Sequence, residues 1–458
     1  MNGDFTVSEN RSSFTGKIGF VLAAAGSAVG LGNIWRFPYL AAKYGGGIFL
    51  LVYVLLAVTF GFTLMVAEIA IGRKTQQSPV GAYRALDKRF AFVGYLASIV
   101  PMLILPYYSV IGGWVLKYGV GFVTGGADAM AEDTFFGNYI SSLAEPLLWF
   151  GVFIGVTALI VLFGVQKGIE KVSKLLMPVL VVLMIFIVIY SFCTIDGAFE
   201  GAVYYIKPDF SKFSIMTVVA AMGQLFYSMS LAMGIMITFG SYMKKDISIA
   251  KSTHQIEIFD TGIAFLAGMM IVPACYAFSG GDPAALGKGP GLMFGVLPKV
   301  FDNMPGGSVI GAIFFVMVLL AALTSSISLM ETVVSTVQDK WGVERRLSCG
   351  IVFALSLLLG VPSCLGFNVW SAISFNGMSI LDMFDFLTNS IMMPIIALMT
   401  CILIAFFVKP KTVIEEVSLS GEFKEKTLFS VVIRYVAPVC ILVILVSAVL
   451  EAFGVLSI

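Results

Sequence analysis

The residues with the clearest chemical potential lie near the start of the chain, where residues 26–38 read GSAVGLGNIWRFP. They interrupt an apolar segment long enough to cross a membrane. Glycine weakens a helix and proline is tolerated mainly in its first turn, so we predict a helix that stops, runs extended and restarts just before Pro38. Backbone groups freed at membrane depth must line a cavity or be buried in protein. The alternative is a glycine-rich face for close helix packing, but packing explains neither Asn33 nor Arg36.

The composition defines the class of protein. Of the 458 residues, 59% are hydrophobic and 12% are charged, against about 45–50% and about 25% in soluble domains. We therefore predict an all-α polytopic membrane protein in contact with the lipid bilayer. The net charge of +1 and the single histidine argue against a nucleic-acid partner, and the six cysteines form no metal or disulfide pattern. No nucleophile–base motif is present, so enzyme activity is not expected. The polar first sixteen residues do not fit a cleavable signal peptide.

Apolar segments of sufficient length predict about eleven transmembrane helices. They lie near 17–41, 47–72, 91–122, 147–164, 170–193, 214–241, 257–279, 307–338, 348–366, 375–408 and 429–455. Basic residues cluster after the even-numbered helices, whereas the loop 123–146 is acidic and has no Lys or Arg. The basic side is therefore predicted to be cytoplasmic, with the N-terminus inside. The loops 194–213 and 280–306 then lie outside, as gates or as passive connectors.

Helix 6 repeats the irregularity of helix 1, because residues 224–234 read QLFYSMSLAMG at its middle. Helices 1 and 6 are five apart and run in opposite directions, which predicts two inverted five-helix repeats that each begin with an interrupted helix. Interrupted helices at matching positions mark the central site of known transporters. The expected divisions are a cytoplasmic segment 1–16, repeats 17–193 and 214–408, a cytoplasmic loop 409–428 and an additional helix within 429–458.

These features together resemble the neurotransmitter:sodium symporter family. The matching positions are the 26–38 motif, Gly45-Gly46-Gly47, Tyr107-Tyr108, the 228–234 break, Thr324-Ser325-Ser326, and Asp382 with Asp385. Short tails and an acidic loop without cysteines are similar to the bacterial, LeuT-like amino-acid transporter branch. The resemblance implies a multi-pass protein of the cytoplasmic membrane of a prokaryote.

The resemblance implies two sodium sites built from backbone and side-chain oxygens. The first would use Ala28, Asn33, Ser228 and Asp260, and the second Gly26, Val29, Ala321, Thr324 and Ser325. Two alternatives stay open. Asp260 also fits an interface position at the inner end of helix 7, and the helix-8 hydroxyls also fit bonds to their own helix.

Chloride is not expected as a partner. In relatives that bind it, the positions of Tyr53, Gln224 and Ser228 act with a helix-7 serine, but that last position is Ala264 here. Asp260 would already supply the negative charge.

The resemblance also implies an α-amino acid substrate. Carriers of amines have an aspartate at the position of Gly30, so here the substrate's own carboxylate is expected near the first sodium, the Gly32 N–H and the Tyr108 hydroxyl. The ammonium would meet carbonyls around Ala28, Tyr227 and Ser230.

The side-chain pocket is expected to be apolar and uncharged, which favours a neutral apolar or aromatic substrate. Its positions are Ile104, Tyr227, Met233, Ser325 and Leu329. Met233 taken alone equally fits ordinary core packing. The methyl group of Ala232, where relatives often have glycine, leaves the preferred substrate size open.

Two charged pairs are the expected gates: Arg36 with Asp385 outside, and Arg11 with Asp339 inside. Arg11 also fits a positive-inside anchor, and Phe14 replaces the tryptophan that usually lies beside the inner pair.

Three further positions carry expectations. Glu68 would brace the break in helix 6. Gly168 and Pro178 either mark where the inner half of helix 5 unwinds or only kink it. No partner is evident for Glu331, and His254 is expected to be solvated in a cytoplasmic loop.

The sequence thus predicts a sodium-coupled symporter of neutral amino acids that works by alternating access. The competing interpretation is a sensor or channel-like protein on the same scaffold, which would keep the binding residues and lose the gating pairs.

Overall fold

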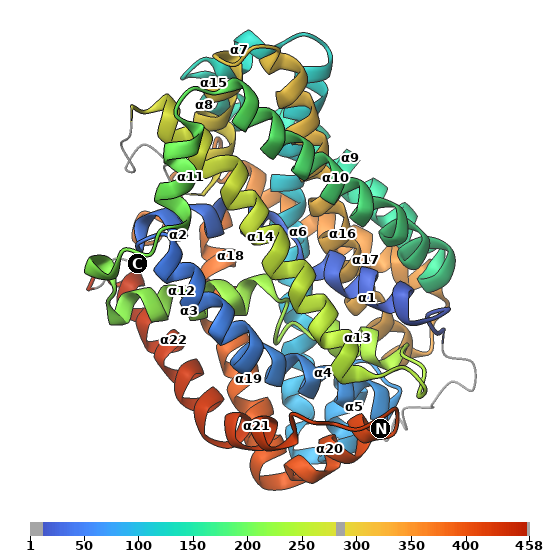
Figure 1. Cartoon of the computed structure of the whole chain (residues 1–458). Coiled ribbons are helices and arrows are strands. Elements are labelled where there is room, and N and C mark those ends of the chain that lie inside the picture. The colour runs from blue at the N-terminus through green and yellow to red at the C-terminus, as the bar shows by residue number, and fades with distance from the viewer. Residues whose placement is uncertain (1–11, 281–288, 456–458) are drawn as a thin grey trace.

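The computed structural model describes residues 12–280 and 289–455, and these residues form helices and turns without a β-strand (Figure 1). Within them, nine helices are long and apolar enough to cross a membrane. They are Gly47–Thr75 (α3, η2 and α4), Lys88–Val123 (η3 and α6), Ala144–Leu162 (α9), Val165–Thr194 (η4 and α10), Ile249–Phe278 (α14), Gly307–Trp341 (α16), Arg345–Leu365 (α17), Ile380–Val408 (α18, η8, α19 and η9) and Lys426–Ala452 (α21, η10 and α22).

The first predicted span is a bent pair that can supply a tenth crossing. Helix α1 (Lys17–Ala28) meets the segment Gly32–Lys43, which contains the π-helix η1 (Gly32–Arg36) and α2 (Phe37–Lys43), at an angle of 57°. The region expected near 214–241 is divided into α12 (Ile215–Ser228) and α13 (Ile235–Ser241), both shorter than a full span. The count of eleven stays a prediction.

The break in helix 1 is shorter than expected. Val29 is extended (ψ 103°), but the Asn33 N–H already bonds to the Gly30 carbonyl at 3.2 Å and the Phe37 N–H bonds to Gly32. Helical hydrogen bonding therefore resumes directly after Gly30, and the prediction of a restart just before Pro38 is wrong. Pro38 lies just after the π-helix, so its missing N–H lies where the hydrogen-bonding pattern changes from π-helix to α-helix.

The break in helix 6 is held in an unusual backbone conformation. Ser230, Ala232 and Gly234 have φ values of 52°, 60° and 71°. Residues other than glycine rarely adopt this left-handed backbone conformation. A Cβ at Gly234 would also lie 2.6 Å from Pro79 and 2.8 Å from the Ala97 carbonyl. Such strain persists only where the surroundings enforce it, and it concentrates at functional sites.

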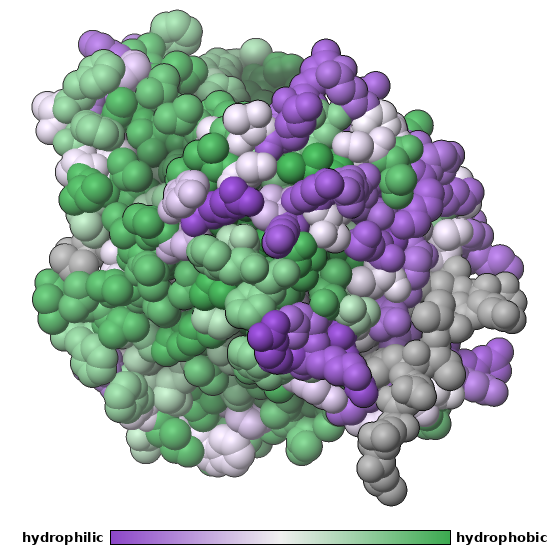
Figure 2. Space-filling model, turned by 90° about the horizontal axis from the view of Figure 1, so that it is seen from below, coloured by the Kyte–Doolittle hydropathy of each residue, from purple (hydrophilic) through white to green (hydrophobic). Residues whose placement is uncertain are grey.

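The long helices α6 and α16 cross the middle of the molecule, and α9, α10, α17 and α22 lie further out (Figure 1). In these outer helices the most apolar stretch is 28–39% buried, compared with 56–61% in α6, α14 and α16. Side chains of the outer helices therefore form the lipid-facing surface. Figure 2 shows this extensive hydrophobic surface next to a region where hydrophilic side chains gather.

Glycines join the second half of helix 6 to helix 2. A Cβ at Gly72 would lie 1.9 Å from the Ile237 carbonyl, and one at Gly240 would lie 2.4 Å from the Ile69 carbonyl. Because the backbones touch at both points, α13 and α4 are packed as one unit. This packing fixes the C-terminal side of the helix 6 break.

The segments predicted to lie outside carry short helices. The 194–213 loop contains α11 (Ala198–Ile206), and the described part of 280–306 contains η7 (Leu292–Val296) and α15 (Leu297–Asp302). The Tyr118 hydroxyl donates to the Phe294 carbonyl at 3.0 Å, and the Trp114 ring contacts Phe294 edge-on. The second loop is thus fastened to α6, and its role as a gate stays a prediction.

Candidate substrate and sodium site

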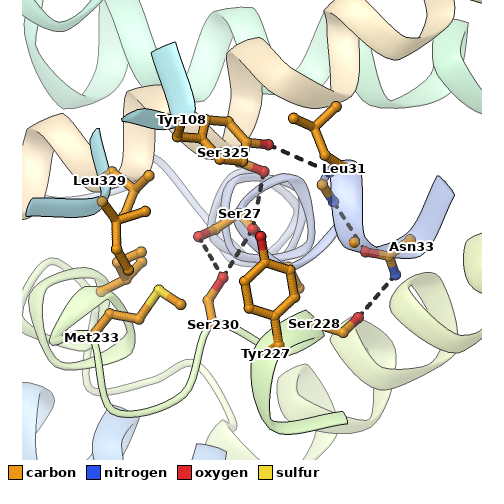
Figure 3. A pocket seen from close by; sticks show the side chains of 15 residues that line it. Ser27, Leu31, Asn33, Tyr108, Tyr227, Ser228, Ser230, Met233, Ser325 and Leu329 are labelled. Atoms are coloured by element: carbon orange, nitrogen blue, oxygen red, sulfur yellow. Dashed lines mark hydrogen bonds between the residues drawn. The ribbon is translucent and has the colours of Figure 1, made fainter. Parts of the chain in front are cut away.

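The two helix breaks and the middle parts of α6 and α16 enclose a cavity of about 400 Å³ (Figure 3). All ten residues predicted to contact the substrate line it: Ala28, Gly30, Gly32, Ile104, Tyr108, Tyr227, Ser230, Met233, Ser325 and Leu329. Three further lining residues were not predicted, namely Ser27, Leu31 and Ile235. Ser27 and Leu31 belong to the interrupted stretch itself, and this membership is the signal that could have identified them.

The residues expected at the first sodium site come together around Asp260. The Asp260 Oδ1 atom accepts hydrogen bonds from Ser228 Oγ at 2.7 Å and from Asn33 Nδ2 at 2.8 Å, and Oδ2 accepts one from the Tyr53 hydroxyl at 3.1 Å. All four side chains are buried. Ala28 lines the same cavity.

The oxygens of Asp260, Ser228 and Asn33 are the kind of ligand that a hard cation such as sodium binds. A buried carboxylate is costly without a positive partner, and in the part of the chain that the structure describes Asp260 contacts only neutral donors. The nitrogen of the Asn33 amide faces Asp260, and the oxygen of the same amide, Asn33 Oδ1, accepts from the Gly30 N–H at 3.1 Å. The predicted use of the amide oxygen as a ligand therefore requires this amide to rotate.

Oxygens also converge at the positions expected for the second sodium site. Ser325 Oγ lies 3.1 Å from the Val29 carbonyl and 3.4 Å from the Gly26 carbonyl, and Thr324 Oγ1 lies 3.0 Å from the Ala321 carbonyl. The Ser325 contacts join α16 to the break in helix 1. Thr324 bonds within its own helix, as the alternative interpretation expects.

The donors that a chloride ion would need are already used. Tyr53 and Ser228 both donate to the Asp260 carboxylate, and Gln224 Nε2 donates to the Gly32 carbonyl at 3.1 Å. Ala264 is buried and has no hydroxyl to add.

With this geometry established, comparison with known proteins identifies the chain. The model of the sodium:neurotransmitter symporter family matches residues 11–126 and 138–455. The chain belongs to this family.

The relatives are similar over their whole length. An uncharacterized sodium-dependent transporter of Bacillus subtilis, YhdH, is 35% identical over 449 residues, which cover 96% of this chain and 97% of the relative. An uncharacterized sodium-dependent transporter of Haemophilus influenzae is 32% identical over 458 residues, which cover 96% of this chain and 99% of the relative. The solved structure of MhsT in complex with L-phenylalanine has a TM-score of 0.86, is 36% identical, and aligns with 96% of this chain and all of MhsT.

These matches confirm the predicted fold class and the predicted family. The symporter is a sodium-dependent membrane transporter and not an enzyme.

The two residues predicted to form the outer gate, Arg36 and Asp385, have different partners in this structure. Asp385 Oδ1 accepts hydrogen bonds from the Tyr107 hydroxyl at 3.0 Å and from Asn389 Nδ2 at 2.6 Å. The Arg36 guanidinium instead lies 5.8 Å from the centre of the Tyr227 ring. Arg36, Tyr227 and Asn389 line a second cavity of about 560 Å³, and because Tyr227 also lines the first cavity, the two are neighbours.

One member of the predicted inner pair, Arg11, lies outside the described residues. Asp339 accepts a hydrogen bond from the Ser78 N–H at 2.8 Å, at the start of α5 (Pro79–Leu86). Phe14 is fully buried, and its ring contacts Phe239 with the centroids 5.7 Å apart. A phenylalanine therefore fills this position closely in place of the tryptophan.

Glu68 contacts the break in helix 6, and the unwinding of helix 5 stays a prediction. Glu68 Oε1 accepts the Ala232 N–H at 2.7 Å, inside the helix 6 break. Ala232 is not among the cavity-lining residues, so its methyl group does not narrow the cavity in this structure. Gly168 lies in the π-helix η4 (Val165–Glu170) and Pro178 in α10 (Lys171–Thr194), which form one continuous span here.

Glu331 has partners that sequence reasoning did not find. It is buried on α16, accepts from the Tyr242 hydroxyl at 2.8 Å, and forms an ion pair with Arg345 at the start of α17. The cluster joins the end of helix 6 to helices 8 and 9. Nothing in the spacing of these residues indicates the contact, because it depends on how three helices pack.

The expectation that His254 lies in a loop is wrong, although its side chain is 40% exposed. His254 lies in α14 and its ring stacks on Phe62, with the centroids 4.5 Å apart. Its nitrogens face Glu257 at 3.2 Å and Glu425 at 3.5 Å. The apolar segment from which helix 7 was predicted starts later than the helix itself, because polar residues form its first turns.

Proposed function

We propose that this transporter is a sodium-coupled symporter of neutral, apolar or aromatic amino acids that works by alternating access and does not need chloride. The observation that carries the proposal is the lining of the central cavity, in which no residue is charged.

The lining of the cavity favours an amino acid with an apolar side chain. Ile104, Met233, Ile235 and Leu329 provide an apolar wall. A charged side chain would be buried there without a counter-charge, at a high desolvation cost. The complex of MhsT, at 36% identity, with L-phenylalanine supports the same class of substrate.

Polar groups on the opposite wall suit the two charged ends of an α-amino acid. The Tyr108 hydroxyl lies 3.4 Å from the Leu31 N–H, close to Gly30. A Cβ at Gly30 would lie 2.9 Å from Ser325 Oγ and 3.2 Å from the Tyr108 hydroxyl. The aspartate that amine carriers have at this position would displace these hydroxyls, so the carboxylate is supplied by the substrate. Its ammonium faces carbonyl groups and Ser230.

Two sodium ions are the proposed coupling partners. The first lies with Asp260, Asn33, Ser228 and the Ala28 carbonyl, where the substrate carboxylate adds a further oxygen. Binding of each then strengthens binding of the other, because the two opposite charges meet among buried side chains, where their attraction is stronger than in bulk water. The second lies between the break in helix 1 and the hydroxyls of α16. Each charge that moves through 100 mV contributes about 2.3 kcal/mol to accumulation.

Chloride independence follows because the hydroxyl groups that would bind the ion already donate to Asp260. Tyr53 and Ser228 give their hydroxyl hydrogens to Asp260. A chloride ion beside this carboxylate would meet a like charge and find these donors occupied. The fixed carboxylate thus supplies the charge that the halide provides in chloride-dependent relatives.

Transport by alternating access rests on the charged pairs at both ends of the cavity. The separated pair of Arg36 and Asp385 closes the outer path in the occluded state, and Asp339 with Arg11 closes the inner path. The N-terminus lies inside the cell. Glu68 braces helix 6, and helix 5 unwinds between Gly168 and Pro178. A sensor would need neither pair to open and close.

Competition by all twenty amino acids against one labelled ligand tests the substrate class. We expect purified protein to bind labelled L-phenylalanine in sodium, and large neutral amino acids to displace it. Aspartate, glutamate, lysine and arginine should not compete. Equal displacement by a charged amino acid would contradict the assignment of the cavity, and full binding in potassium alone would contradict sodium coupling.

A further inference from the structure

A recess of about 540 Å³ lies at the N-terminal end of η4 and α10, on the side predicted to be cytoplasmic. Its lining residues are Thr15, Gln166, Lys167, Glu170, Lys171 and Lys174. The three lysines are spaced four and three residues apart, so they lie on one face of the helix. The central cavity and the gates do not involve these lysines.

The recess carries a net positive charge although one carboxylate lies in it. Glu170 is buried, and it accepts from the Thr15 N–H at 2.8 Å, from the Thr15 hydroxyl, and from Lys174 Nζ at 2.6 Å. Lys174 therefore neutralises Glu170. Lys167 and Lys171 are exposed and form no ion pair with any residue that the structure describes. Two positive charges remain available to an anion.

The lysine face continues into an apolar stripe on the same helix. Leu175, Val182 and Ile189 are 64%, 64% and 57% exposed, and they lie four, eleven and eighteen residues after Lys171. At 3.6 residues per turn these offsets fall on the side of the helix that Lys171 occupies. The span that contains α10 is also the least buried of the nine apolar spans within the described residues, at 28%. Basic head and exposed apolar stripe therefore form one continuous surface.

We propose that this surface binds an anionic phospholipid, with its phosphate between Lys167 and Lys171 and an acyl chain along the stripe. Basic pockets at the cytoplasmic ends of membrane helices attract anionic headgroups. A soluble phosphate would use the lysines and leave the stripe without a role, so the lipid accounts for both parts of the surface. The proposal goes beyond the transport function and does not require the assigned substrate.

A bound headgroup also has a local consequence. Lys167 and Lys171 flank Gly168, the residue in η4 at which helix 5 is predicted to unwind. A phosphate that bridges the two lysines holds this turn helical. Backbone amides of 165–174 then exchange hydrogen more slowly when the lipid is bound.

The test compares two double variants that remove equal charge. In Lys167→Gln/Lys171→Gln the proposed site is lost, and in the control Lys424→Gln/Lys426→Gln two exposed lysines of another segment are lost. Native mass spectrometry of the full chain measures retention of phosphatidylglycerol against phosphatidylcholine with the same acyl chains. Unchanged thermal unfolding of both variants shows that they are folded.

We expect the wild type and the control to prefer phosphatidylglycerol by about 30-fold and the site variant to lose this preference. Hydrogen exchange in 165–174 should slow with phosphatidylglycerol in the wild type and in the control, and stay unchanged in the site variant. An equal loss in both variants, or no preference in the wild type, would overturn the proposal. So would full displacement of the lipid by millimolar inorganic phosphate, which would indicate a soluble-anion site. None of these measurements depends on transport, so the test of lipid binding stays valid even if the proposed amino-acid substrate is wrong.

Discussion

Replacing Asp260 with asparagine separates its two proposed roles, as a sodium ligand and as the fixed negative charge that makes chloride unnecessary. The side chain keeps its shape and one oxygen, so the cavity is not emptied. The charge is lost. Of the three hydrogen bonds that the carboxylate accepts from Ser228, Asn33 and Tyr53, the amide can accept only those that reach its single oxygen.

The size of the effect follows from the charge. Two unit charges 4 Å apart interact by about 4 kcal/mol at an effective dielectric constant of about 20. The amide oxygen still coordinates a cation and recovers part of this energy. We therefore expect a net loss of about 2–3 kcal/mol, which weakens sodium binding by about 30- to 150-fold. Substrate binding at fixed sodium concentration should fall in parallel, because the proposed substrate carboxylate shares the ion.

The assay is sodium-dependent binding of labelled L-phenylalanine to purified protein, measured in sodium chloride and in sodium gluconate. The single amide oxygen of the variant cannot accept from all three donors, so a hydroxyl of Tyr53 or Ser228 becomes free to donate to a halide. Chloride should then improve binding that it does not affect in the wild type. Asp128→Asn, at an exposed position of the short helix α7 (Ala127–Ala131), is the matched control and should behave as the wild type. An unchanged sodium dependence in the Asp260 variant, with the protein folded, would refute the site assignment.

Two further predictions concern packing. In Gly32→Ala the added methyl would lie 2.5 Å from a ring carbon of Tyr227 on helix 6. Overpacking of about 1–3 kcal/mol should then weaken substrate binding by about 5- to 150-fold. Gly223→Ala, with nothing nearer than 4.0 Å, should bind normally, and equal affinities of the two variants would contradict the geometry. Glu331→Gln leaves the Arg345 guanidinium without its buried partner, which should destabilise the fold by about 3 kcal/mol. The thermal unfolding midpoint should therefore fall, whereas Glu344→Gln, at an exposed position, should leave it unchanged. Equal midpoints of the two variants would show that the ion pair contributes little.

The central cavity was accessible to sequence reasoning because its residues violate local rules. Glycine, asparagine and arginine in an apolar helix are conspicuous, and the second interruption in helix 6 identified its counterpart. The family resemblance then assigned positions on α6 and α16, such as Tyr108 and Leu329, that look like ordinary core residues by themselves. Gly30, Gly32, Asn33, Tyr108 and Leu329 line one cavity in the structure, and Arg36 lines the neighbouring one.

Contacts between distant segments were not accessible in this way. Glu331 is conspicuous as a single polar residue, but its partners Tyr242 and Arg345 come from other segments and carry no local signal. The restart of helix 1 was placed too late because Pro38 dominates the pattern, whereas the helix resumes through hydrogen bonds of Gly30 and Gly32. Local propensity describes where a helix is weak, and tertiary packing decides where it breaks.

Uptake into vesicles tests the central claim of sodium-coupled amino-acid transport most directly. Purified protein is reconstituted into phospholipid vesicles and labelled L-phenylalanine is supplied outside. We predict that an inward sodium gradient drives accumulation above the external concentration and that dissipating the gradient releases the label. Equal uptake under an inward potassium gradient, or binding in sodium without any accumulation inside, would contradict the account.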